Sequence, residues 1–150
     1  LDIENANIIE LIKEIKANYK NASPGIELVN LPKEKYLDVD VNRFKMLLRN
    51  VLSNAVKYSD NDSNSIQVRL DENKDSVILA IEDDGCGIPE EELPYIFEPF
   101  YRVEKSRSKR TGGFGLGMSL CKNIIEAHGD EIWIESELDK GTTVYLKLNE

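Results

Sequence analysis

Residues 43–59 read RFKMLLRNVLSNAVKYS, and the rest of the chain is organised around this stretch. Its apolar side chains recur at i, i+3, i+4, i+7, i+8 and i+11, at Phe44, Leu47, Leu48, Val51, Leu52 and Ala55. This spacing is typical of an amphipathic helix with one face on a core. A polar row borders that face, at Asn50, Asn54, Lys57 and Tyr58. Such groups could hold a metal, a phosphate and a flat ring, although for this stretch alone a solvated helix face is the simpler interpretation.

Length and composition limit the class of protein. The 150 residues, 41% hydrophobic and 31% charged, are typical of a single globular domain spanning residues 1–150. A net charge of -9 argues against non-specific binding to nucleic acid or to an anionic membrane. The sequence contains neither a membrane-spanning apolar run nor a signal-peptide pattern, so we expect a soluble domain or a soluble piece of a longer protein. Cys86 and Cys121 lack metal-ligand spacing and are typical of a reducing compartment.

Hydrophobic periodicity predicts the secondary structure along the chain. Helices are expected at residues 3–19, 43–59 and about 115–128. Strands are expected at residues 26–29, 37–39, 66–70, 77–81, 132–134 and 144–148, the last four as two hairpins. Residues 90–100 begin helically and are interrupted by Pro94. Because helices and strands do not alternate regularly, we expect an α+β fold, a two-layer sandwich with a mixed sheet covered on one face by three helices.

Two glycine-rich segments are candidate ligand sites. Residues 83–89 read DDGCGIP and follow a buried strand; the glycines permit close approach of a ligand, and Asp83 can accept hydrogen bonds from an amine or from water. An ordinary turn explains this segment equally well. Residues 112–117 read GGFGLG and lead into a helix, whose free N–H groups suit phosphates. The pattern is neither a P-loop nor a dinucleotide fingerprint. A flexible linker is the alternative, but the cations just before it favour a lid over a polyphosphate: Arg102, Lys105, Arg107, Lys109 and Arg110.

The single histidine, His128, lies at the end of an apolar helical row. We therefore expect it to be a helix-terminal or packing residue rather than a catalytic one. No Ser-His-Asp arrangement can be built around it.

Five segments in this order resemble the ATP-binding catalytic domain of bacterial sensor histidine kinases, in the superfamily shared with gyrase, the large heat-shock chaperone and mismatch-repair ATPases. Residues 50–59, NVLSNAVKYS, resemble the N box, and residues 83–89 the first glycine box. Residues 96–102, IFEPFYR, resemble the F box. Residues 113–118, GFGLGM, resemble the second glycine box, and residues 140–143, KGTT, the final Gly-Thr element. The resemblance runs from about Leu28 to the end and implies a Bergerat-type ATP-binding fold.

The resemblance implies ATP and Mg²⁺ as ligands and assigns roles to particular residues. Asp83 would bind the adenine amino group, with Thr142 near the associated water network. Asn50 and Asn54 would face the metal and the phosphates, while Lys57 and Arg102 would neutralise phosphate charge. The implied catalytic residues are Asn50, Lys57 and Arg102. The implied ATP-binding residues are Asn50, Asn54, Lys57, Tyr58, Asp83, Gly85, Gly87, Ile88, Tyr101, Arg102, Gly113, Gly115, Leu116, Gly117 and Thr142.

Asn50 stands where ATP-hydrolysing members of the superfamily carry a glutamate base. An amide cannot act as a general base near neutral pH, so we expect the site to hold ATP for transfer to a histidine. No histidine precedes residue 128, so the phosphoacceptor is expected on a dimerisation domain absent from this chain. The implied partners are that domain and a response regulator. We expect a cytoplasmic, monomeric domain, without direct membrane or nucleic-acid contact, whose parent protein could be a membrane receptor.

Two alternatives remain at this stage. A serine kinase of the anti-sigma-factor type uses the same fold, but such kinases usually lack a long basic lid, and the F box favours a histidine kinase. A degenerate module that only binds proteins is disfavoured by the intact Asn54, Asp83 and box glycines.

Overall fold

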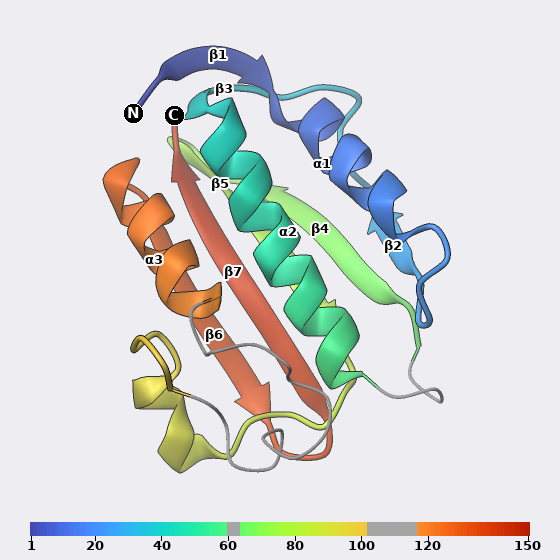
Figure 1. Ribbon diagram of the computed structural model, residues 1–150. Helices are drawn as coiled ribbons and strands as arrows, with labels where there is room; N and C mark the ends of the chain where they lie inside the picture. The colour runs from blue at the N-terminus through green and yellow to red at the C-terminus, as the bar shows by residue number, and fades with distance from the viewer. Residues whose placement is uncertain (60–63, 102–116) are drawn as a thin grey trace.

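The computed structural model describes residues 1–59, 64–101 and 117–150. The main sheet has five strands in the order β2-β4-β5-β7-β6: Ile26–Val29, Ile66–Glu72, Ser76–Asp83, Gly141–Asn149 and Glu131–Glu137. β2 runs parallel to β4, and every other neighbouring pair is antiparallel. Three helices lie over one face of this sheet: α1 (Ile8–Lys16), α2 (Val41–Tyr58) and α3 (Gly117–Ala127) (Figure 1). The expected two-layer α+β sandwich is confirmed.

The central helix α2 begins two residues earlier than its periodicity predicts, because Asp40 caps it. The Asp40 carboxylate accepts a hydrogen bond from the Arg43 amide at 3.1 Å, which satisfies one of the free N–H groups of the first turn. The six apolar residues of its predicted stripe are all buried. They join one hydrophobic cluster with residues of α1, α3 and the main sheet.

Both predicted hairpins are present. β4 pairs with β5, and β6 with β7, each pair antiparallel. β5 is the middle strand of the sheet and the more buried partner of its hairpin, as predicted from its continuous apolar run.

The helix predicted over residues 3–19 is wrong for residues 3–7. β1 (Ile3–Asn7) is a strand that pairs with β3 (Tyr36–Asp40) in a separate two-stranded sheet. The helix begins only after Asn7, whose side-chain oxygen accepts hydrogen bonds from the amides of Ile9 at 3.2 Å and Lys35 at 3.0 Å. The predicted strand at 37–39 exists, but it belongs to this small sheet. The last predicted turn is the 3-10 helix η1 (Ala17–Tyr19).

The segment after the first glycine box forms a 3-10 helix, η2 (Glu90–Tyr95), which contains Pro94. The segment begins helically as predicted, and the helix ends at Tyr95, one residue after Pro94, because a short 3-10 turn tolerates one missing backbone donor. α3 begins at Gly117 within the described part of the chain, and residues 115 and 116 of its predicted start lie outside it. Among the described helices, none combines the length and apolar character needed to cross a bilayer.

Candidate functional site

Three polar side chains lie in one row across the end of the main sheet. Asp83 on β5 is the register partner of Thr142 on β7, and Thr142 is the register partner of Ser136 on β6. The row therefore continues the helix-covered face on which Ile81 and Val144 are buried in the core.

Asp83 is a buried carboxylate, only 8% exposed. It accepts a hydrogen bond from the amide of Gly85 at 2.9 Å, and the amides of Gly85 and Thr142 both act to lower its pKa. Burial nevertheless raises the pKa of this carboxyl to about 6, and repulsion from Asp84 and Glu82 adds to the effect. Within the described ranges no lysine, arginine or histidine forms an ion pair with it. A buried, destabilised acceptor of this kind indicates a binding or catalytic site.

The first glycine box packs tightly between α2 and the turn joining β6 to β7. The Cys86 amide donates to the carbonyl of Tyr58 at 3.2 Å, and a Cβ on Gly85 would lie 2.3 Å from that same oxygen. Gly87 has a φ of +73°, and a Cβ there would lie 2.2 Å from the Glu137 carbonyl oxygen. The predicted tight turn is present, and the close approach that requires glycine is to the chain's own backbone.

The start of α3 lies against the polar row of α2. A Cβ on Gly117 would lie 3.5 Å from Asn50 Oδ1 and 3.8 Å from Asn54 Nδ2. Asn50 donates its Nδ2 to the Met46 carbonyl at 2.9 Å, which leaves Oδ1 as the group facing Gly117. The structure thus brings together two side-chain amides and a helix start, as the sequence predicted. Lys57 is exposed and Tyr58 half-buried at the end of the same helix.

The structure leaves the place of several predicted site residues untested, and puts Tyr101 elsewhere. Arg102, Gly113, Gly115 and Leu116 lie outside the described residues. Tyr101 lies against η2, where its hydroxyl donates to Glu92 at 2.6 Å and its ring lies 5.7 Å from that of Tyr95. A role for these five residues in ATP binding stays a prediction.

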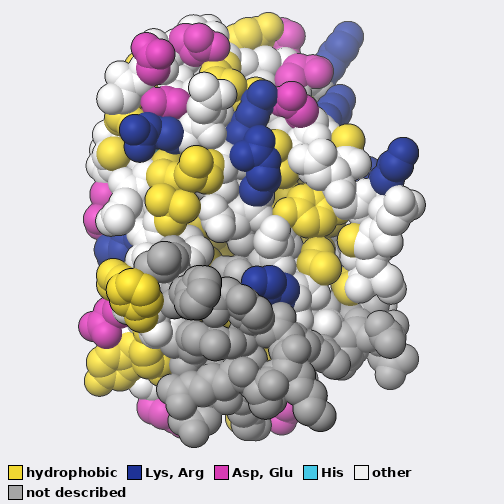
Figure 2. Space-filling model, in the orientation of Figure 1, with side chains coloured by type: hydrophobic (Ala, Val, Ile, Leu, Met, Phe, Trp, Pro, Cys, Tyr) yellow, Lys and Arg dark blue, Asp and Glu magenta, His cyan; other side chains and the backbone are white. Residues whose placement is uncertain are grey.

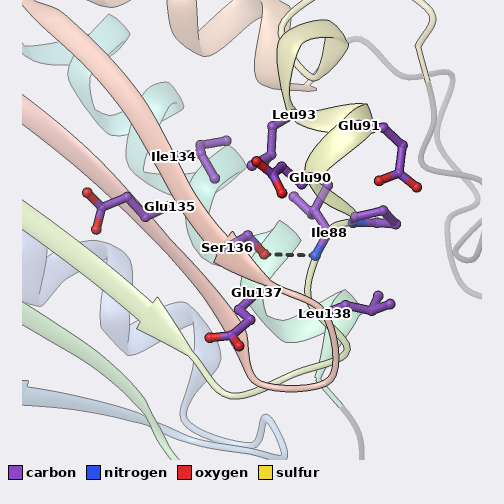
Figure 3. A pocket seen from close by; sticks show the side chains of 10 residues that line it. Ile88, Glu90, Glu91, Leu93, Ile134, Glu135, Ser136, Glu137 and Leu138 are labelled. Atoms are coloured by element: carbon purple, nitrogen blue, oxygen red, sulfur yellow. Dashed lines mark hydrogen bonds between the residues drawn. The ribbon is translucent and has the colours of Figure 1, made fainter.

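Sequence reasoning missed Ser136, which links the first glycine box to the Gly-Thr element. Its Oγ accepts a hydrogen bond from the Ile88 amide at 2.8 Å (Figure 3) and donates to the Gly141 carbonyl at 2.9 Å. It also lies 2.7 Å from Thr142 Oγ1. The predicted turn at 139–141 would have placed residue 136 opposite 144, whereas the observed turn at 138–140 places it opposite 142.

A groove of about 580 Å³ lies beside this row, between η2 and β6 (Figure 3). Its apolar lining includes Ile88, Leu93, Ile134 and Leu138. Four of its ten lining residues are glutamates, at positions 90, 91, 135 and 137, so it would repel a polyphosphate.

His128 is a structural residue, as the sequence predicted. Its Nδ1 donates to the Ile124 carbonyl at 2.8 Å, and its Nε2 accepts from the Asp40 amide at 3.0 Å. Nδ1 thus fixes the ring to its own helix, and Nε2 joins the end of α3 to the residue that caps α2.

The fold, a buried carboxylate and a polar helix edge beside a helix start are the features of a nucleotide-binding domain. The family model of histidine kinase-, DNA gyrase B- and HSP90-like ATPases matches residues 39–150. The chain belongs to this family, and within it represents the ATP-binding catalytic domain of sensor histidine kinases, which act in two-component signalling.

Individual relatives support this assignment. The chain is 36% identical over 121 residues to sensor histidine kinase WalK of Bacillus subtilis (strain 168), covering 79% of this chain and 20% of WalK. It is 33% identical over 151 residues to YkoH of the same organism, covering 100% and 33%. The match to sensor protein SrrB of Staphylococcus aureus is 37% over 144 residues, covering 94% and 24%. The chain thus spans a fifth to a third of the length of these relatives.

Solved structures agree with the fold. The mycobacterial sensor histidine kinase MprB superposes with a TM-score of 0.85 at 26% identity, covering 97% of each chain. The nucleotide-free catalytic domain of histidine kinase ThkA superposes with a TM-score of 0.83 at 25% identity, covering 99% of this chain and 98% of that one.

Proposed function

We propose that this domain binds Mg-ATP and donates the γ-phosphate to a histidine on a separate helical dimerisation domain, from which a response regulator takes it. The observation that carries the proposal is Asp83: a buried carboxylate, with its pKa raised to about 6, next to a glycine box and in register with Thr142. Such an acceptor is complementary to the exocyclic amino group of adenine. The named relatives are sensor kinases and sensor proteins, which supports phosphotransfer as the reaction.

The residues near Gly117 fit a magnesium ion that arrives with the triphosphate. Asn50 and Asn54 supply neutral amide groups, and no group of three or more His, Cys, Asp or Glu suited to a metal occurs in the described residues. Mg²⁺ usually keeps several waters and takes few protein ligands besides substrate phosphates. When bound, it would supply charge neutralisation at the phosphates, with the start of α3 contributing its free amides.

In this proposal the residue at position 50 does not activate water for hydrolysis of ATP. Asn50 lies where a base would be needed, and its amide cannot remove a proton near neutral pH. Asn50 therefore orients the phosphates, and Lys57 and Arg102 are proposed to balance the charge that develops on transfer. ATP hydrolysis should be slow, so that the γ-phosphate is retained for the acceptor histidine.

The helical face also exposes apolar surface on which an acceptor domain could dock. Tyr95 is 48% exposed and Phe100 70%, and hydrophobic side chains gather over η2 in Figure 2. We propose this surface as part of the contact with the dimerisation domain. A cytoplasmic location follows from the use of ATP, and we expect the isolated domain to be a monomer.

Calorimetric titration of ATP, with and without MgCl₂, tests the proposal. The parent chain should bind ATP more tightly with Mg²⁺, and Asp83→Asn should lose most of this affinity. Asp84→Asn is the matched control, since it removes the same charge from an exposed neighbour that hydrogen-bonds Asn64. Failure of the folded parent chain to bind ATP, or equal losses in both variants, would contradict the proposal.

A further inference from the structure

The hydrogen bonds around Ser136 determine which way its hydroxyl proton points. A serine hydroxyl has one hydrogen to donate and two lone pairs with which to accept. The Ile88 amide can only donate, so Ser136 accepts there, at 2.8 Å. The Gly141 carbonyl can only accept, so the one Ser136 hydrogen is directed to it, at 2.9 Å.

This arrangement fixes the neighbouring threonine as well. Ser136 Oγ lies 2.7 Å from Thr142 Oγ1 and has no hydrogen left for that contact. Thr142 must therefore donate its hydroxyl hydrogen to Ser136, which then has all three of its hydrogen-bonding positions occupied. Thr142 Oγ1 is left with lone pairs only, so it can act on any further group as an acceptor but not as a donor.

Thr142 stands between Ser136 and Asp83 in the row across the sheet. The two residues are register partners on β5 and β7, so they lie side by side. Asp83 in its ionised form is also an acceptor only. The end of the sheet therefore presents two adjacent acceptors and no side-chain donor from this pair.

We infer that Ser136 is a positioning residue for base selection: by taking the Thr142 hydroxyl hydrogen, it makes the base pocket accept from an amino group and disfavour a carbonyl. The inference rests on the proposed function, because it concerns the base of the nucleotide that Asp83 binds. A 6-amino purine brings two N–H donors to this edge, directly or through water. A 6-oxo purine brings an acceptor, which neither Asp83 nor Thr142 can satisfy.

Ser136 acts only through Thr142, which gives the inference a specific test. Titration of ADP and of inosine diphosphate, by calorimetry at pH 7.5, measures the preference for adenine over hypoxanthine. Ser136→Ala frees the Thr142 hydrogen to turn toward a carbonyl, so this preference should fall roughly three- to tenfold, the usual effect of one hydrogen bond. Ser136→Thr keeps the hydroxyl on a strand position and should restore the preference.

A double variant separates positioning from a general loss of structure. Thr142→Val removes the hydroxyl that Ser136 orients, so Ser136→Ala added to Thr142→Val should change the preference no further. Ser76→Ala, at the opposite end of β5 from Asp83, controls for loss of a buried serine and should leave the preference unchanged. If Ser136→Ala does not fold, Ser136→Cys provides a near-isosteric side chain with a weak hydrogen-bonding group.

The outcomes distinguish the two proposals. A folded parent chain that binds neither nucleotide overturns the proposed function and the inference with it. A parent chain that prefers ADP, with the same preference in Ser136→Ala or Ser136→Cys, overturns the inference alone. Additive effects of the Ser136 and Thr142 substitutions would also overturn it.

Discussion

Replacement of Asp83 by asparagine removes the proposed base-binding group. Even so, the unfolding free energy of the variant relative to the parent should increase as the pH rises. Burial raises the pKa of the Asp83 carboxyl from 3.8 to about 6. In the window between these values the folded chain binds more protons than the unfolded chain, so the unfolding free energy falls with increasing pH. A shift of about two units, at about 1.4 kcal/mol each, corresponds to about 3 kcal/mol lost by pH 7.5.

Asp83→Asn does not titrate, so its stability relative to the parent should increase by about 3 kcal/mol between about pH 4 and pH 7.5. The variant keeps a neutral carbonyl oxygen for the Gly85 amide, and the weaker hydrogen bond should cost about 1 kcal/mol at every pH. The pH dependence of the difference, and not its absolute value, therefore reports the buried charge.

Urea unfolding across this pH range, followed by the fluorescence of the single tryptophan Trp133, measures the difference. Asp71→Asn, at an exposed position on β4, reports the effect of removing a surface charge by the same substitution. A difference between Asp83→Asn and the parent that stays constant from pH 4 to pH 7.5 would refute the reasoning.

Three further predictions test other parts of the structure. Gly85→Ala should lower the unfolding free energy, measured in urea, by about 1–3 kcal/mol or more, because its Cβ would meet a backbone carbonyl oxygen at 2.3 Å. Gly25→Ala is the control and should have little effect, since a Cβ there would have nothing within 4 Å. Equal stabilities of the two variants would contradict this prediction. His128→Ala leaves the amide that begins α2 without its partner and should cost about 1–3 kcal/mol by the same assay, so parent-like stability would show that the contact is unimportant. Iodoacetamide should modify the exposed Cys86 long before Cys121, because burial raises the pKa of the Cys121 thiol to about 12. ADP should slow the modification of Cys86. Mass spectrometry would contradict the first expectation if both cysteines are labelled at the same rate, and the second if Cys86 is labelled equally fast with and without ADP.

Features that depend on near neighbours in the chain could be predicted from the sequence. The stripe from Phe44 to Ala55 predicts α2, because helical geometry places those side chains on one face whatever surrounds them. Alternation of apolar and polar residues predicts the strands of both hairpins, because successive side chains of a strand point to opposite faces of a sheet. The order of Asn54, Asp83 and the glycines along the chain is enough to indicate the family.

Other features arise from contacts between distant segments. Residues 3–7 have no helix-breaking residue, and they become a strand because β3 offers pairing partners 29 to 37 positions along the chain. The buried state of Asp83, and hence its raised pKa, depends on its place at the end of the central strand beneath the helices. Neither can be read from local periodicity.

The sequence by itself determined the central helix, both hairpins and most of the chemical groups at the site, but neither the strand at residues 3–7 nor Ser136. Only the tertiary structure decided how those groups are oriented, and Ser136 is the clearest case. No local pattern singles it out, yet the register of β6 with β7 aligns it with Thr142 and Asp83. The physical reason is that a hydroxyl acquires a direction only from the donors and acceptors around it, and here these come from the start of β7 and from the loop that follows β5.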